Sequence, residues 1–348
     1  NPVGVAVEDI VAILRISGAD TTDNSWTIDG FNSGSVDTDG DAEADFVFTN
    51  FNQLFGGAGD DTFNFVDAGN ITGQIDGGAS TNIVNGMSAG NPVSTVDLTF
   101  QLQGDAVARG DQTITSLVDI SDVVVNPANT NTLIGPDQDS TWNINAIGGG
   151  TVTGGFTFSG FDALVGNAGA DIFQINGGAI ATVNGQSGSD RLVAGTGANT
   201  FLITSDDEGS LNGATTFLNI ENLQGNSGAD SFSLESGATL TGRIDGLGGA
   251  NDELIADDVE NTWTITSANS GDVTGVGDFV GIERLTGGSA QDAFTFSDGA
   301  RVSIVDGVGA GNRMRFVAES GAIVVNMPSS DAAGVSYSNI AAIDANNA

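Results

Sequence analysis

The stretch G-G-A-G-D-D-T-F-N, from Gly56 to Asn64, decides the fold of this 348-residue chain. It matches the repeat G-G-x-G-x-D-x-U-x, in which U is a large apolar residue, at every fixed position. The turn glycines allow sharp bends of the backbone, and Phe63 starts a short strand with one inward-facing side. Turn carbonyls and Asp61 can together offer oxygens to a hard cation such as calcium. The turn glycines are Gly56, Gly57 and Gly59.

This nonapeptide recurs in degraded form along the chain. The closest copies each begin two residues after a leucine, and a weaker copy follows each of them after 19 to 21 residues. The closer copies begin at Gly56, Gly166, Gly225 and Gly287, and the weaker ones at Gly77, Gly185, Gly246 and Gly307. Aspartates at or next to the sixth position of these copies are the candidate calcium ligands. They are Asp61, Asp171, Asp190, Asp230, Asp252 and Asp292.

A second landmark is an aromatic residue that begins an alternating strand, as in N-T-W-T-I around Trp263. Trp142 and Phe201 are 59 residues apart, and Phe201 and Trp263 are 62 apart. Trp26 precedes Trp142 by 116 residues, which predicts a degenerate unit between them. The superrepeat is therefore near 60 residues with an inner step near 20, which predicts three coils in each superrepeat.

Short strands that bury alternate residues and are separated by glycine turns predict a repeat fold. A coil of about 20 residues cannot bury its own apolar face, whereas stacked coils pair each strand with its neighbours and close a continuous core. We therefore expect an all-β, right-handed parallel β-solenoid, since parallel crossovers are right-handed. The rival is a set of immunoglobulin-like sandwich domains, which would need units of about 100 residues.

One solenoid segment is expected to occupy residues 1–348, as a piece of a longer protein. Residues 1–25 are expected to form a first strand or coil, and residues 86–141 to form degenerate coils with a loop insertion near Ala108. Terminal coils are expected over 316–348. The superrepeats are predicted at 26–85, 142–200, 201–262 and 263–315.

The composition narrows the chemistry available to the chain. It has no cysteine, histidine or lysine, which excludes disulfides, catalysis by thiol or imidazole, and histidine metal sites. The formal net charge of −37 makes nucleic acid an unfavourable partner and cations natural ones. The same acidity serves equally to keep a secreted protein soluble. No apolar run approaches the ~20 residues of a membrane span.

Two interpretations of the aspartates stay open. Asp171 is expected to stack over Asp190, and Asp230 over Asp252, where a shared calcium ion would relieve the repulsion between the carboxylates. Alternatively, the aspartates cap turns by hydrogen bonding to their own backbone, which asparagine does equally well. Asparagine replaces aspartate in two of the weaker copies. These positions are Asn82 and Asn312.

The tryptophans and the acidic loops supply the remaining candidates. The tryptophans share one register position with Phe201 and are expected in a core ladder, and the alternative is stacking on sugar rings at the surface. Two acidic clusters, Asp37–Asp45 and Asp206–Glu208, are candidates for carboxylate catalysis and are more simply interpreted as solvated loops. We therefore expect no enzymatic activity.

The nonapeptide copies resemble the calcium-binding RTX repeats of secreted bacterial proteins. The larger unit, with F-L-N-I-E-N-L-Q-G from Phe217 and L-T-G-R-I-D-G from Leu240, is similar to repeats of large secreted adhesins of the filamentous-haemagglutinin kind, including biofilm matrix adhesins. This resemblance covers most of residues 24–315. It implies a non-enzymatic structural and adhesive rod, exported by two-partner secretion to the bacterial cell surface or the extracellular space. The implied partners are exopolysaccharide or like rods.

The chain departs from the RTX pattern in one respect. RTX blocks run their nonapeptides back to back, whereas about a dozen other residues follow each copy here. Two alternatives to the adhesin therefore stay open. One is a calcium-dependent RTX-type protein, with calcium as the cofactor, and the other is a β-helix polysaccharide lyase or hydrolase.

Overall fold

The computed structural model describes residues 15–19, 22–86, 98–102, 114–317, 325–326, 331–332 and 334–346. Over these ranges the protein consists of strands of two to six residues and contains no helix, so the predicted all-β class is confirmed. The chain divides into two compact units. Unit 1 comprises Asn1–Pro136 and Gly154–Phe161, and unit 2 comprises Asp137–Thr153 and Asp162–Ala348.

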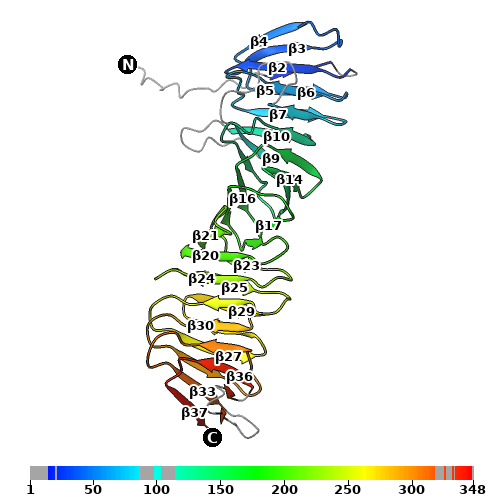
Figure 1. Cartoon of the computed structure of the whole chain (residues 1–348). Coiled ribbons are helices and arrows are strands. Elements are labelled where there is room, and N and C mark those ends of the chain that lie inside the picture. Colours follow the sequence, from blue (N-terminus) through cyan, green and yellow to red (C-terminus); the bar gives the residue numbers. More distant parts are fainter. Residues whose placement is uncertain are drawn as a thin grey trace, which may run out of the picture. The chain divides into compact units, whose positions relative to one another are not determined.

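In unit 2 the chain crosses repeatedly between two sheets, 2A and 2B, whose strands are stacked side by side (Figure 1). Sheet 2A contains β16 (Ala163–Ala168), β18 (Thr182–Ser187), β20 (Thr200–Ser205), β21 (Glu208–Leu211), β22 (Thr215–Leu218), β24 (Ser231–Leu234), β26 (Glu253–Ile255), β30 (Arg284–Thr286), β32 (Ile304–Asp306), β34 (Val325–Asn326), β35 (Asp331–Ala332) and β36 (Val335–Ser338). Sheet 2B contains β13 (Thr141–Ala146), β14 (Gly149–Val152), β17 (Ile172–Ile175), β19 (Arg191–Val193), β23 (Asn222–Gln224), β25 (Leu240–Asp245), β27 (Thr262–Ser267), β28 (Ser270–Val273), β29 (Val276–Val280), β31 (Ala293–Phe296), β33 (Arg313–Val317) and β37 (Ala342–Asn346).

Parallel pairing in unit 2 places apolar residues of successive strands at equivalent positions. In sheet 2A Phe232 is paired with Leu254, and Leu254 with Leu285. In sheet 2B Phe173 is paired with Leu192. All five side chains are buried, whereas their neighbours along each strand are more exposed. Because successive side chains of a strand point to opposite faces, one face of each sheet forms a continuous apolar core.

The sheets are mixed, which corrects the expectation of wholly parallel sheets. Strands β27, β28 and β29 form an antiparallel meander, and β20, β21 and β22 form another. The last strand of each meander pairs in parallel with an upstream strand, β29 with β25 and β22 with β18. Tight turns make the reversal possible, because Asp207 and Asn269 adopt left-handed backbone conformations with φ of 55° and 54°.

The same antiparallel strands explain the length of the superrepeat. Trp142 and Trp263 lie on β13 and β27 in sheet 2B, whereas Phe201 lies on β20 in sheet 2A. From one of these aromatic residues to the next, the chain crosses between the sheets five times. A whole coil returns the chain to the same sheet and so needs an even number of crossings. Because five is odd, each meander lies in the sheet opposite to that of the previous one. A superrepeat therefore does not consist of three whole coils, as the spacing predicted.

Unit 1 also has two sheets. Sheet 1A contains β1 (Arg15–Ser17), β5 (Gln53–Gly57), β7 (Gln74–Gly78), β9 (Thr99–Leu102), β10 (Ile114–Val118) and β12 (Thr132–Ile134). Sheet 1B contains β2 (Ser25–Gly30), β3 (Ser33–Asp37), β4 (Phe46–Thr49), β6 (Thr62–Phe65), β8 (Ile83–Asn85), β11 (Asp122–Val124) and β15 (Phe156–Ser159). Strands β2, β3 and β4 form an antiparallel meander.

Four strands of unit 1, β9, β10, β11 and β12, lie in the stretch in which the sequence predicted degenerate coils. Strands β9 and β10 pair in parallel with each other, β10 also pairs with β7, and β9 also pairs with β12. The insertion expected near Ala108 lies outside the described residues, as does most of the first coil expected over residues 1–25.

The aromatic residues form a core ladder. Trp26, Trp142 and Trp263 are fully buried, which confirms the core interpretation of these side chains over surface stacking on sugars. Each ring stacks on a phenylalanine of the neighbouring strand. The centroid distances are 5.6 Å for Trp26 and Phe63, 5.8 Å for Trp142 and Phe173, 4.8 Å for Phe201 and Phe232, and 5.4 Å for Trp263 and Phe294.

Truncation of this aromatic ladder is expected to destabilise the protein strongly. Trp263→Ala should lower the free energy of unfolding by about 3–5 kcal/mol, because a large buried ring is lost and a cavity remains. Ile147→Ala is the control, since Ile147 is 89% exposed, and it should change that free energy by less than about 0.5 kcal/mol. Chemical denaturation measures both variants, and equal effects would contradict the buried position of Trp263.

Candidate functional site

A set of buried polar residues recurs at one structural position. Each is the residue immediately before a strand, at the corner where the chain enters a sheet. We call this set the corner ladder. It contains all six predicted aspartates, none of which is more than 1% exposed, namely Asp61, Asp171, Asp190, Asp230, Asp252 and Asp292. The other members are Asn24, Asn82, Asn131, Ser140, Asn199, Asn261 and Asn312.

One type of hydrogen bond joins these residues from strand to strand. The backbone N–H of one member donates to a side-chain oxygen of the member on the neighbouring strand. Asp171 N donates to Asp190 Oδ1 at 2.7 Å, 19 residues on, and Asp230 N donates to Asp252 Oδ1 at 2.7 Å, 22 residues on. The structure therefore stacks these two pairs as the sequence predicted. The link within each pair is an N–H to a carboxylate oxygen.

The same bond extends the corner ladder in both units. The donors and acceptors are Ser140 N to Asp171 Oδ1 at 2.8 Å, Asn199 N to Asp230 Oδ1 at 2.8 Å, Asn261 N to Asp292 Oδ1 at 2.9 Å and Asn24 N to Asp61 Oδ1 at 2.8 Å. The aspartates thus bond the backbone of a neighbouring strand, whereas the turn-capping interpretation had them bond their own turn. Asp230 does both, because its Oδ2 also accepts from Asn226 N at 2.8 Å.

The second carboxylate oxygen of most ladder aspartates points into the protein against a glycine. A Cβ on Gly166 would lie 2.3 Å from Asp171 Oδ2, and one on Gly185 would lie 2.2 Å from Asp190 Oδ2. Only glycine leaves room for the carboxyl group at this distance. Five of these oxygens are buried and have no hydrogen-bond partner. They belong to Asp61, Asp171, Asp190, Asp252 and Asp292.

Burial dominates the electrostatics of the corner ladder. Loss of hydration raises the pKa of Asp171 to about 7, and the nearby charges of Asp190 and Asp139 add to the rise. Burial also raises the pKa of Asp190 and of Asp252 to about 6, with Glu221 and Glu283 as their respective acidic neighbours. The pKa values of two further aspartates are raised by the same desolvation. These are Asp61 and Asp292.

The ladder aspartates do not fit a calcium ion. Calcium requires six to eight oxygen ligands at about 2.3–2.6 Å, gathered around one point. Here Oδ1 already accepts backbone N–H groups, and the buried Oδ2 lies against glycine. The nonapeptide glycines are packed instead of open, since a Cβ on Gly59 would lie 2.4 Å from the carbonyl oxygen of Thr22. Gly56 and Gly57 lie in β5, and a Cβ on Gly56 would meet Asp61 Oδ2.

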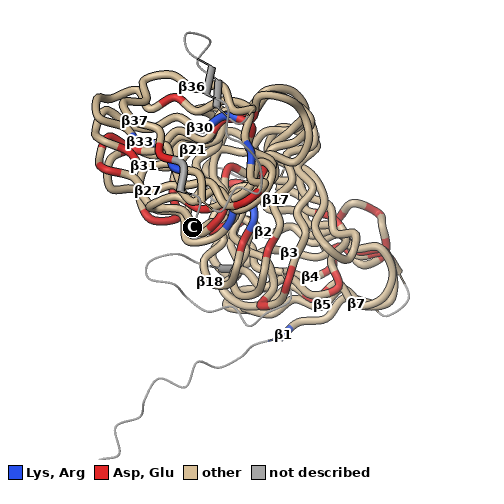
Figure 2. Tube along the Cα trace, turned by 90° about the horizontal axis from the view of Figure 1, so that it is seen from below, with Lys and Arg blue, Asp and Glu red and all other residues tan. Residues whose placement is uncertain are grey.

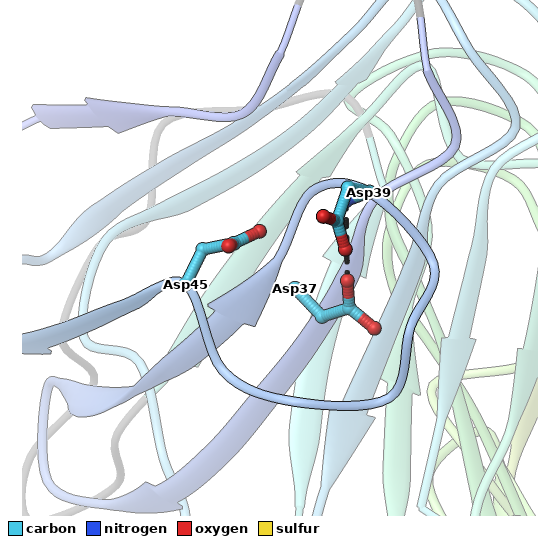
Figure 3. Close-up of side chains that lie close together, drawn as sticks. All are labelled: Asp37, Asp39 and Asp45. Carbon is cyan, nitrogen blue, oxygen red and sulfur yellow. Dashed lines mark hydrogen bonds between the residues drawn. The ribbon is translucent and has the colours of Figure 1, made fainter.

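A different acidic group does gather its oxygens. Asp37, Asp39 and Asp45 lie at the loop between β3 and β4, and their carboxylate oxygens lie within 4.8 Å of one another (Figure 3). Within the described ranges no other group of three or more acidic residues is so close. The alternating aspartates D-T-D-G-D from residue 37 are the sequence signal for such convergence. Exposed acidic groups commonly gather without an ion, and these carboxylates also accept hydrogen bonds from their own loop, since Gly40 N donates to Asp37 Oδ1 and Thr38 N donates to Asp45 Oδ2, each at 2.8 Å.

The second acidic cluster serves the local structure. Asp206 Oδ1 accepts from Thr239 Oγ1 at 2.7 Å, and Asp207 Oδ1 accepts from Thr241 N at 2.7 Å. These bonds tie the turn between β20 and β21 to the segment that leads into β25. Glu208 accepts from Ser205 within the same turn. Each carboxylate of the cluster therefore has a structural partner.

Acidic side chains are spread over much of the chain, and arginines are few (Figure 2). Arg243 pairs with Asp278 at 2.6 Å, and Arg284 pairs with Glu253 at 3.7 Å. The causes of the raised pKa values of Asp171, Asp190 and Asp252 therefore include acidic neighbours and no basic residue.

Comparison with known proteins finds no matching family model, no matching curated protein and no matching solved structure. In the part of the chain that the structure covers, no helix has the length and apolar character needed to cross a membrane.

A substitution at a ladder glycine tests the packing of the carboxyl groups. Gly166→Ala should lower the free energy of unfolding by about 2–3 kcal/mol, because the new methyl group overlaps Asp171 Oδ2. Gly248→Ala is the control, since a Cβ there meets nothing within 4 Å, and it should be neutral or slightly stabilising. Urea denaturation distinguishes them, and a tolerated Gly166→Ala would show that the carboxyl group does not lie against this glycine.

Proposed function

We propose that this chain is a non-enzymatic structural segment of an extracellular bacterial adhesin, folded as a right-handed β-solenoid. One observation carries the proposal. In unit 2 strands follow one another in register from β16 to β33, with a buried apolar position in each strand and a ladder residue at corner after corner. The residues of such a chain serve mainly to stack one strand on the next, which suits a spacer.

The strand pairing supports a mechanical role. From β17 to β33 each strand of unit 2 is hydrogen bonded to two neighbouring strands, and ladder residues add bonds at the corners. In such quasi-one-dimensional proteins, stability is the sum of the stabilities of repeats and of the interfaces between neighbouring repeats. A load applied to the chain is then shared among many equivalent contacts, which suits a stiff element that holds binding regions away from the cell.

The implied partners are matrix exopolysaccharide and like rods. The strong negative charge of the chain favours neutral or cationic polysaccharides and repels anionic ones at low ionic strength. The resemblance of the repeats to those of matrix adhesins supports this choice of partner.

Small-angle X-ray scattering together with a polysaccharide assay tests the proposal. A compact protein of this length would have a radius of gyration of about 20 Å, and we expect a larger value for a stacked solenoid. We also expect the purified chain to leave neutral polysaccharide uncleaved, as judged by reducing ends, and its melting midpoint to be the same in calcium and in chelator.

Each alternative has its own signature in these measurements. Release of reducing ends would favour a β-helix polysaccharide lyase or hydrolase. A β signal in circular dichroism that is lost in chelator would favour a calcium-dependent RTX-type protein. A radius of gyration near the compact value would contradict the solenoid.

A further inference from the structure

Asparagine side chains in the corner ladder show what this position requires. Asn312 Nδ2 donates to the carbonyl oxygens of Gly307 and Gly309 at 2.7 Å, and to that of Asn339 at 3.0 Å. In unit 1 Asn82 Nδ2 donates to Asp119 O at 3.1 Å. Nδ2 is the inner atom of this side chain, the one that points into the protein. It is surrounded by main-chain carbonyl oxygens, and the NH₂ group of asparagine donates the hydrogen bonds that these acceptors need.

The second oxygen of the ladder aspartates occupies the equivalent place. A Cβ on Gly307 would lie 2.3 Å from Asn312 Nδ2 and 2.7 Å from Asn339 O. A Cβ on Gly185 would likewise lie 2.2 Å from Asp190 Oδ2 and 2.3 Å from Asn219 O. In both cases, therefore, the inner side-chain atom, Asn312 Nδ2 or Asp190 Oδ2, and a main-chain carbonyl oxygen of the next layer lie beside the glycine.

The same arrangement recurs at the other aspartates. A Cβ on Gly246 would lie 2.8 Å from Asp252 Oδ2 and 2.2 Å from Gly281 O. A Cβ on Gly56 would lie 2.1 Å from Asp61 Oδ2 and 2.5 Å from Gly77 O. An ionised carboxylate only accepts hydrogen bonds, so a buried Oδ2 beside carbonyl oxygens would be repelled by them.

A proton resolves this conflict. We propose that Asp61, Asp171, Asp190 and Asp252 are neutral carboxylic acids in the folded protein. In each, Oδ1 accepts the N–H of the neighbouring strand, while Oδ2 carries the proton and donates it to a main-chain carbonyl. The ligand of this position is a proton in place of a metal ion, and the protonated aspartate takes the role that asparagine has elsewhere in the corner ladder.

The charged groups around these aspartates also favour the protonated, neutral form. Asp139 faces Asp171, Glu221 faces Asp190, and Glu283, Asp230 and Asp245 face Asp252. All are acidic, and negative neighbours favour the neutral form of a buried carboxyl group. The assignment goes beyond the proposed function and does not depend on it.

Asp230 is the exception that the same chemistry predicts. Its Oδ1 accepts from both Asn199 N and Asn199 Nδ2, and its Oδ2 accepts from Asn226 N at 2.8 Å. Three donors converge on this carboxyl group, and asparagine would present an NH₂ group to one of them. Both carboxylate oxygens of Asp230 therefore already accept hydrogen bonds, and the assignment does not extend to this residue.

The consequence is a fold that is more stable in acid. The pKa of each neutral aspartate is raised in the folded state above its ordinary value, so the folded protein binds more protons than the unfolded chain between about pH 4 and pH 7. The stability that these protons supply is present at low pH and is lost as the pH rises through 6 to 7. Most proteins that bury paired carboxylates behave in the opposite way.

Thermal melts of matched variants at pH 5 and pH 8, at constant ionic strength, test the assignment. The wild-type midpoint should be lower at pH 8 by about 5 °C or more. The triple variant Asp171→Asn, Asp190→Asn and Asp252→Asn should match the wild type at pH 5 and exceed it at pH 8. The control replaces three exposed aspartates by asparagine at Asp29, Asp137 and Asp272, which removes the same charge and should keep the pH dependence.

Two reciprocal variants and a direct readout complete the design. Asn312→Asp should create a new loss of stability above neutral pH, and Asp230→Asn should lower the midpoint at both pH values. The infrared carbonyl band of protonated carboxylic acids should be present at pH 5, should disappear as the pH rises through 6 to 7, and should weaken in the triple variant.

Three outcomes would overturn the assignment. One is a triple variant that is less stable than the wild type at both pH values. Another is a wild-type midpoint that does not change between pH 5 and pH 8. The third is calcium that raises the wild-type midpoint at pH 8 and has no effect on the triple variant, which would make the ligand a cation.

Discussion

The whole arrangement depends on satisfying one buried N–H group at each corner. Parallel strands of three to six residues bond to each other along their length, but the chain changes direction where it enters a sheet. A backbone N–H buried at that corner would otherwise lack a partner, at a cost of about 1–3 kcal/mol. The side-chain oxygen of the next ladder residue accepts it, as Asp190 Oδ1 does for Asp171 N.

This constraint explains the motif that dominates the sequence. The residue before the strand must carry an acceptor, so a short polar residue stands before strand after strand, and at two corners a glutamate accepts instead, Glu221 from Asp190 N and Glu283 from Asp252 N. The inner atom of each ladder aspartate needs space, so a glycine stands five or six residues earlier, as Gly166 does for Asp171 and Gly246 for Asp252. The pattern Gly-x-x-x-x-Asp is thus a rule of packing and hydrogen bonding. It coincides with a calcium-binding pattern because both combine glycine with a short carboxylate five residues later.

Much of the fold could be predicted from the sequence because the apolar period is strict. The F-x-F and F-x-I segments predicted inward-facing strands, and the recurrence of Trp142, Phe201 and Trp263 predicted a buried ladder that the structure confirms. The meanders could not be predicted in the same way. Their turns, such as Ala268 and Asn269, have the composition of every other turn in this chain, and only pairing shows that the strand reverses there.

The chemistry of the aspartates was harder to predict for a related reason. A sequence shows that Asp and Asn alternate at one position, which is compatible with a metal site, a turn cap or an inter-strand bond. What separates these is the direction of each oxygen: Oδ1 faces an N–H of the neighbouring strand, and Oδ2 faces glycine. Asp230 shows that the partners of this side chain depend on its immediate surroundings, since one extra donor, the backbone N–H of Asn226, gives its Oδ2 a hydrogen-bond partner.

Because ladder residues such as Asp171 and Asp230 both donate through their backbone and accept through their side chains, neighbouring layers are coupled in sequence. Removing the acceptor of Asp252 leaves Asp230 N without a partner, and distorting Asp230 in turn affects Asn199 N. Such nearest-neighbour coupling makes a stack cooperative even though no residue contacts a distant layer. The coupling also limits local opening, since an opening must break corner bonds in two adjacent layers before it can spread.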